Sequence, residues 1–152
     1  MLIHTRISGH VDVPLEPALA FLGDFQNLPL WHVSVIAVKD VVGTQLEVGS
    51  TATLVLKGSG GLVDDHVEVI EAEPLRMSKQ VGRGPLNFTS TMRYTPVGRG
   101  YDWVWEQENE WPDGLPGVFG DEAFMGRFME QVLRHSAENA RLMLEAMVPV
   151  AV

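Results

Sequence analysis

One long amphipathic stretch, residues 121–148, constrains the fold of this chain more than any other part of the sequence. On a helix of about 100° per residue, one face carries charges of alternating sign, as in Glu130 and Arg134, which is typical of a solvated surface. Asp121 is a suitable N-cap, and Pro149 favours an end just before it. The opposite face needs another element to pack against, and it comprises Phe124, Met125, Phe128, Met129, Val132, Leu142, Met143, Ala146 and Met147.

Three polar residues interrupt the middle of that apolar face: His135, Ser136 and Asn139. Side chains that donate and accept hydrogen bonds on a buried stripe either pair with protein groups or point at a ligand. Two interpretations follow. His135 and Asn139 line a ligand cavity, or His135 lies at the edge of the stripe and meets backbone or solvent.

The chain before this helix is a succession of short segments. Residues 2–13 alternate apolar and polar side chains, as a half-buried first strand does. Two short helices are predicted at 14–22 and 25–28, the first because proline is tolerated in a first helical turn. Six further strands, separated by turn residues, are predicted at 33–41, 51–57, 62–73, 75–81, 86–95 and 101–111.

This order predicts an α+β fold, in which a curved antiparallel sheet of about seven strands wraps around the long C-terminal helix. The two short helices after the first strand plug one end of the sheet. The clean alternation of the last two strands indicates one wet face and one covered face. Because one helix cannot fill a strongly curved sheet, we expect an interior cavity between them.

The inward faces of the last two strands supply most candidate cavity residues. Gln107 and Asn109 are consecutive inward amides, which are costly in a dry core, so a wet or ligand-lined pocket explains them better. Plain core packing is the alternative for the tryptophans and for the Met and Phe positions. The predicted ligand-binding residues are Phe88, Ser90, Met92, Tyr94, Trp103, Trp105, Gln107, Asn109, Phe128, Val132, His135 and Asn139.

Asp65 is a further polar candidate on the strand 62–73. If Val63 and Val67 face inward, Asp65 does so too, and a buried carboxylate with a raised pKa is suited to general acid or base chemistry. The glycine loop beside it favours the alternative, a solvated strand end. No catalytic residue is assigned, because the sequence has no Ser/His/Asp spacing, paired-carboxylate motif or dinucleotide fingerprint. No metal site is predicted either, since a helical His-x-x-x-His is absent, and no cofactor is expected.

Length and charge narrow the classes of partner. The 152 residues are predicted to form a single domain, 1–152, large enough to bury a core. A net charge of -9 repels nucleic-acid phosphates and disfavours an anionic membrane surface. No apolar run is long enough for a membrane span, no signal peptide precedes the first strand, and cysteine is absent. We therefore expect a cytoplasmic protein with no nucleic-acid partner and no membrane insertion.

Four parts of the chain together resemble a known family: the opening strand with residues 14–16 (PLE), residues 21–31 (FLGDFQNLPLW), the strand end at 69–74, and the closing helix. They are similar to the START-like or birch-pollen-allergen-like SRPBCC superfamily, and within it to the polyketide cyclase/dehydrase and lipid-transport group. The resemblance covers the whole chain. It implies a helix-grip fold with a deep hydrophobic cavity between sheet and C-terminal helix, and it places Trp31 and His32 near the cavity mouth.

Members of this family bind lipids, sterols, polyketides or hormones, and a minority are enzymes. We therefore expect binding of a hydrophobic small molecule that is lipid-, polyketide- or aromatic-like. One alternative is a polyketide cyclase, aromatase or dehydratase in which His135 or Asp65 moves protons. Tyr94, Gln107 or Asn109 would then hold carbonyls. Another alternative is a non-catalytic structural or regulatory domain with a filled core. Homodimers are common for such domains, although nothing in the sequence marks an interface.

Overall fold

The computed structural model describes residues 1–58 and 60–147. Ser59 of the glycine loop, and Val148 and Pro149 at the predicted helix end, lie outside the described residues. In chain order the elements are β1 (Leu2–Val11), α1 (Leu15–Leu22), the 3₁₀-helix η1 (Phe25–Asn27), α2 (Leu28–Trp31), β2 (Val35–Val42), β3 (Thr51–Gly58), β4 (Gly61–Glu73), β5 (Met77–Arg83), β6 (Asn87–Val97), β7 (Gly100–Glu110), the 3₁₀-helix η2 (Gly117–Gly120) and α3 (Glu122–Met147).

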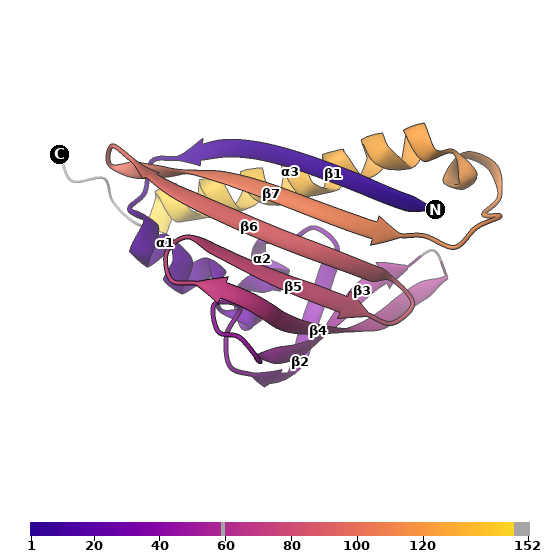
Figure 1. Ribbon diagram of the computed structural model, residues 1–152, viewed down its shortest axis with the longest axis horizontal. Helices are drawn as coiled ribbons and strands as arrows, with labels where there is room; N and C mark the ends of the chain where they lie inside the picture. Colours follow the sequence, from indigo (N-terminus) through magenta and orange to yellow (C-terminus); the bar gives the residue numbers. More distant parts are fainter. Residues whose placement is uncertain (59, 148–152) are drawn as a thin grey trace.

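The strands form one antiparallel sheet in the order β1-β7-β6-β5-β4-β3-β2. Figure 1 shows the curved sheet with α3 lying along β1, and with α1 beside the C-terminal end of α3. The predicted fold class is therefore confirmed: a helix-grip fold with the long helix across one face and short helices after the first strand. One predicted boundary moved because Leu75 has a positive φ of 61°, which makes it a turn residue, so β5 starts at Met77.

Two glycines help to shape the concave face of the sheet. Gly9 lies beneath the ring of Trp103, where an added Cβ would come within 2.6 Å of the indole. Gly82 lies beneath Phe88 in the same way, with an added Cβ only 2.0 Å from the ring. Each aromatic ring thus occupies the space above a strand position that has no side chain. Irregular pairing between β4 and β5 beside Val69 adds a further bend.

The buried side of α3 differs from the apolar face predicted for it. Leu142 and Met147 were predicted to face inward, but their side chains are 54% and 53% exposed. That assignment was wrong because the buried stripe runs through Leu133 and Ala140, and Leu142 lies two residues, or about 200°, away from Ala140. None of the described helices combines the length and hydropathy needed to cross a membrane. The buried residues of α3 are Met125, Met129, Leu133, Ser136, Ala140 and Leu144.

Paired truncations on α3 test this rotation of the helix. Leu133 is 0% exposed, so Leu133→Ala should lower the free energy of unfolding by ~2–5 kcal/mol through lost burial and a cavity. Leu142→Ala removes the same atoms from the exposed side and should change it by less than ~0.5 kcal/mol. Urea unfolding followed by tryptophan fluorescence measures both. Equal losses of unfolding free energy in the two variants would contradict the finding that Leu133 is buried and Leu142 is exposed.

Candidate functional site

A cavity of about 180 Å³ lies between α3 and the concave face of the sheet. Its walls come from the α1–α2 segment, from β3, β5, β6 and β7, and from the first half of α3. Two hollows of about 360 and 330 Å³ lie on the outer face, among solvated side chains that include Arg83 and Glu108. Most of the predicted ligand-binding residues line the inner cavity: Phe88, Ser90, Met92, Tyr94, Trp105, Gln107, Asn109, Phe128 and Val132.

Three of the predicted residues do not line this cavity: Trp103, His135 and Asn139. Trp103 lies over Gly9 and borders a separate small space of about 30 Å³ near the other end of α3. His135 is exposed and does not line the cavity, so the expectation that it faces a ligand was wrong. The physical reason is again the rotation of α3. Position 136, one residue later, is the buried one.

The polar centre of α3 ties the helix to the α2–β2 connection. Ser136 is fully buried, and its Oγ donates to Val132 O (2.8 Å) and accepts from Val33 N (3.1 Å). Asn139 donates its Nδ2 to Trp31 O at 3.3 Å. Of the two interpretations left open for this polar group, pairing with protein therefore applies to Ser136 and Asn139.

A row of four polar residues crosses the concave face at right angles to the strands. Thr5 on β1 pairs with Gln107 on β7, Gln107 pairs with Ser90 on β6, and Ser90 pairs with Gln80 on β5. We call these four residues the polar row. The paired positions on either side are mostly apolar, such as Trp105 opposite Ile7. The row is therefore a polar line across an otherwise hydrophobic floor.

Hydrogen bonds satisfy the middle of the polar row but not its ends. Trp105 donates its Nε1 to Ser90 Oγ at 2.8 Å, and Gln107 donates its Nε2 to Asn109 Oδ1 at 3.0 Å. At the two ends, Thr5 Oγ1 and Gln80 Oε1 are buried without a partner in the described part of the chain. An unpaired buried acceptor costs ~1–3 kcal/mol, so these two oxygens need an explanation.

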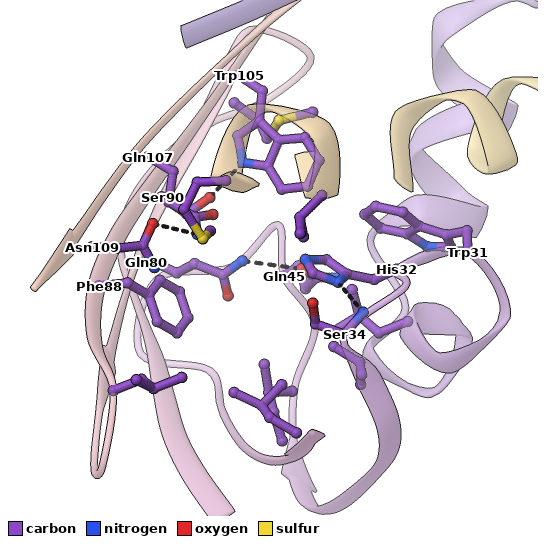
Figure 2. A pocket seen from close by; sticks show the side chains of 18 of the residues that line it. Trp31, His32, Ser34, Gln45, Gln80, Phe88, Ser90, Trp105, Gln107 and Asn109 are labelled. Carbon is purple, nitrogen blue, oxygen red and sulfur yellow. Dashed lines mark hydrogen bonds between the residues drawn. The ribbon is translucent and has the colours of Figure 1, made fainter. Parts of the chain in front are cut away.

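Gln80 reaches from the sheet across the cavity. Its Nε2 donates to Gln45 Oε1 at 3.2 Å, and Gln45 in turn donates its own Nε2 to Leu22 O at 2.8 Å. Figure 2 shows this bridge between the wall formed by the strands and the opposite side of the pocket. Because Gln45 Oε1 is the acceptor of the pair, Gln80 must present its NH₂ there, which fixes Gln80 Oε1 as the free group.

The wall opposite the strands carries a neutral histidine. Burial lowers the pKa of His32 to about 4, so the ring is uncharged at neutral pH. His32 Nδ1 accepts from Ser34 N at 3.2 Å, which leaves the proton on Nε2. The ring lies edge-on to Trp105, with centroids 5.8 Å apart, and next to Trp31 (Figure 2). Trp31 and His32 both line the cavity.

Asp65 is a buried acid just outside this cavity. Its side chain is 0% exposed, and burial raises its pKa from 3.8 to about 6. Oδ1 accepts a long hydrogen bond of 3.4 Å from Leu86 N, whereas Oδ2 has no partner in the described residues. The solvated strand end that the glycine loop favoured was therefore wrong, and the inward alternation of β4 was right. Asp65 does not itself line the cavity.

The charges around the cavity are few. Among the residues that line it, Lys57 is the one side chain that is charged at neutral pH, and it is exposed. In the described residues, no group of three or more His, Asp or Glu side chains is arranged to hold a metal ion. The cavity thus offers aromatic surface, neutral hydrogen-bonding groups and one cation at its edge.

Among the polar residues of the cavity that were not predicted, Gln80 and Gln45 form the bridge across it. Gln80 shares its side of β5 with Ser78 and Gly82, both of which also face inward, so the period-two pattern of this strand could have indicated it. Gln45 lies in the β2–β3 connection and is positioned by its hydrogen bonds to the end of α1. No local sequence signal marks such a contact.

Replacement of Asp65 tests the cost of burying this acid. A carboxyl pKa raised from 3.8 to about 6 means that the folded protein holds the proton more tightly than the unfolded chain. The free energy of unfolding therefore falls as pH rises through this window, by up to about 3 kcal/mol. Asp65→Asn keeps the acceptor for Leu86 N and removes the charge. Relative to wild type, it should be ~1–3 kcal/mol more stable at pH 7 and about equal below pH ~4.

Asp64→Asn is the matched control, because Asp64 is exposed and pairs with Lys39 at 2.7 Å on the other side of β4. This variant should show no gain at pH 7. Urea titrations of both variants at pH 4 and pH 7 give the comparison. A loss of stability in Asp65→Asn that is the same at both pH values would contradict the buried-charge account.

Solved structures share this fold at low sequence identity. A START superfamily protein from Mycobacterium smegmatis superposes with a TM-score of 0.76 at 13% identity, covering 95% of this chain and 99% of that one. A protein from Chromobacterium violaceum gives 0.67 at 18% identity, with 93% and 96% covered. The di-domain ARO/CYC StfQ of the steffimycin biosynthetic pathway gives 0.73 at 10% identity, with 97% of this chain matching 52% of that chain.

These structural similarities establish the fold. A comparison with curated protein sequences found no match. The family model described as "Polyketide cyclase / dehydrase and lipid transport" matches residues 3–145, from β1 almost to the end of α3. A match of that extent includes every wall of the cavity. The chain belongs to the polyketide cyclase/dehydrase and lipid-transport family.

Proposed function

We propose that this protein binds a hydrophobic small molecule in the cavity between α3 and the sheet. The observation that carries the proposal is the cavity of about 180 Å³. Its walls are mainly aromatic and aliphatic side chains, and a few polar groups point into it. Concave, mostly apolar sites with a small number of placed polar groups are the usual form of small-molecule pockets.

The size of the cavity limits the ligand. A dry protein cavity of ~150 Å³ binds benzene, so about 180 Å³ suits a molecule built on a single ring better than a long acyl chain. The walls also suit a ligand built on a single ring, because four aromatic side chains surround the space (Figure 2): Trp31, His32, Phe88 and Trp105.

The entrance is indicated by exposure. Of the residues that line the cavity, Lys57 at the end of β3 and Phe128 on α3 are the two exposed ones. Phe128 is 45% exposed and stacks on Phe124 with ring centroids 6.4 Å apart. We place the mouth between these two elements, with Val132 one helical turn from Phe128 on the inner side.

The alternatives receive less support. In a cyclase or dehydratase, His135 or Asp65 was expected to move protons beside the substrate, but His135 is exposed and Asp65 lies outside the cavity lining. His32 does line the cavity, but burial lowers its pKa to about 4, which makes it a weak base at neutral pH. The likeness to an ARO/CYC di-domain concerns the fold. A structural domain with a filled core does not require a cavity with unpaired polar groups such as Gln80 Oε1.

Blocking the mouth tests the proposal. Titration with p-xylene and p-cresol, followed by calorimetry and thermal unfolding, should give dissociation constants of ~0.1–1 mM for one or both ligands. At ten times that concentration the midpoint of unfolding should rise by about 3–5 °C. Val132→Trp places an indole in the mouth and should abolish the rise.

Gln131→Trp is the control, because the neighbouring residue is exposed and does not line the cavity. It should bind both ligands as the wild type does. If neither ligand binds the wild type, or if Val132→Trp binds as well as Gln131→Trp, the cavity is not the binding site and the proposal is wrong.

A further inference from the structure

The polar row ends in two unpaired oxygens, the hydroxyl oxygen of Thr5 and the amide oxygen of Gln80, and Gln80 also lines the cavity. Gln80 Oε1 is buried without a partner among the described residues, and its NH₂ is committed to Gln45 at 3.2 Å. The amide cannot turn over, because Gln45 Oε1 would then face another oxygen. Gln80 Oε1 is therefore a free acceptor, and a ligand can pair with it only through a hydrogen-bond donor.

Neutral groups surround this acceptor. Ser90, opposite Gln80 on β6, accepts the indole N–H of Trp105, so its own O–H proton is left to donate. Across the pocket, His32 carries its proton on Nε2, because Nδ1 accepts from Ser34 N. Neighbouring strands lie ~4.8 Å apart, so Gln80 and Ser90 present an acceptor and a donor within the span of one ring.

No side chain inside the cavity balances a ligand charge. Lys57 is exposed at the mouth, and no carboxylate is among the lining residues. A charged ligand would lose its hydration without gaining a partner, and this costs far more than a hydrogen bond returns.

We propose that the polar row selects a neutral, ring-sized ligand that carries a hydroxyl group, with Gln80 Oε1 accepting the hydrogen bond from that hydroxyl. This inference rests on the proposed function and names the chemical class of the ligand. The hydroxyl donates to Gln80, its oxygen accepts from Ser90, and the ring packs against Phe88 and Trp105.

Three probes of similar shape separate this idea from simple hydrophobic binding. p-Cresol and p-xylene differ by a hydroxyl in place of a methyl, and p-toluate carries a charge instead. A purely apolar pocket prefers p-xylene, because the hydroxyl of p-cresol must leave water. The polar row should reverse that order, with p-cresol binding about threefold to tenfold tighter than p-xylene. p-Toluate should bind at least about tenfold more weakly than p-cresol.

Two variants test whether Gln80 Oε1 is the source of the preference for p-cresol over p-xylene. Gln80→Met keeps the length of the side chain and removes the acceptor, so p-xylene should become the tighter ligand. Ser78→Ala, two residues away on the same side of β5, should keep the wild-type ratio.

Calorimetric titration of the full-length wild type and the variants gives these ratios, which are insensitive to a general loss of affinity. If p-xylene binds as tightly as p-cresol to the wild type, or p-toluate binds tighter than both, the inference is wrong while the proposed function stands. It is also wrong if Gln80→Met keeps the wild-type ratio, or if Ser78→Ala loses it as fully as Gln80→Met. If no probe binds, the proposed function and the inference both fail.

Discussion

The packing of α3 along β1, at one edge of a sheet that is too curved for one helix to cover, sets the rest of the structure. Met125, Leu133 and Leu144 bury the helix against that side of the concave face, while β5 and β6 lie further around the curve. The segment from α1 to α2 forms one wall of the cavity that remains between α3 and the sheet. The cavity is thus a geometric consequence of wrapping seven strands around a single helix.

The polar row lies where this packing leaves space. In a close-packed core, Gln107, Ser90 and Gln80 side by side would be strongly destabilising unless each group found a partner. The structure satisfies the middle of the row through Trp105 and Asn109 and leaves Gln80 Oε1 free. Natural proteins tolerate such local costs mainly at functional sites, where a ligand supplies the missing partner.

The sequence predicted the sheet and most of the cavity because a strand has a simple period. Once Trp105 faces inward, Gln107 must do so too. The same rule holds for Asp65, where the glycine loop wrongly favoured a solvated strand end. The helix was harder to predict, because its polar centre, residues 135–139, spans just over one turn, and only tertiary contacts select the buried position. Ser136 takes that position by bonding to the α2–β2 connection, which rotates His135 outward. Gln45 could not be predicted, since its place depends on how a loop docks against α1.

Burial shifts each buried titratable group around the cavity towards its neutral form. The pKa of His32 falls to about 4, that of Asp65 rises to about 6, and that of Tyr94 rises above its ordinary value. All three shifts have desolvation as their largest cause, so they report a poorly hydrated interior. In such surroundings a single hydrogen bond is stronger than in water, and an unpaired acceptor is more costly. One free amide oxygen on Gln80 is therefore enough to distinguish a hydroxyl from a methyl group, and no charged residue is needed to do it.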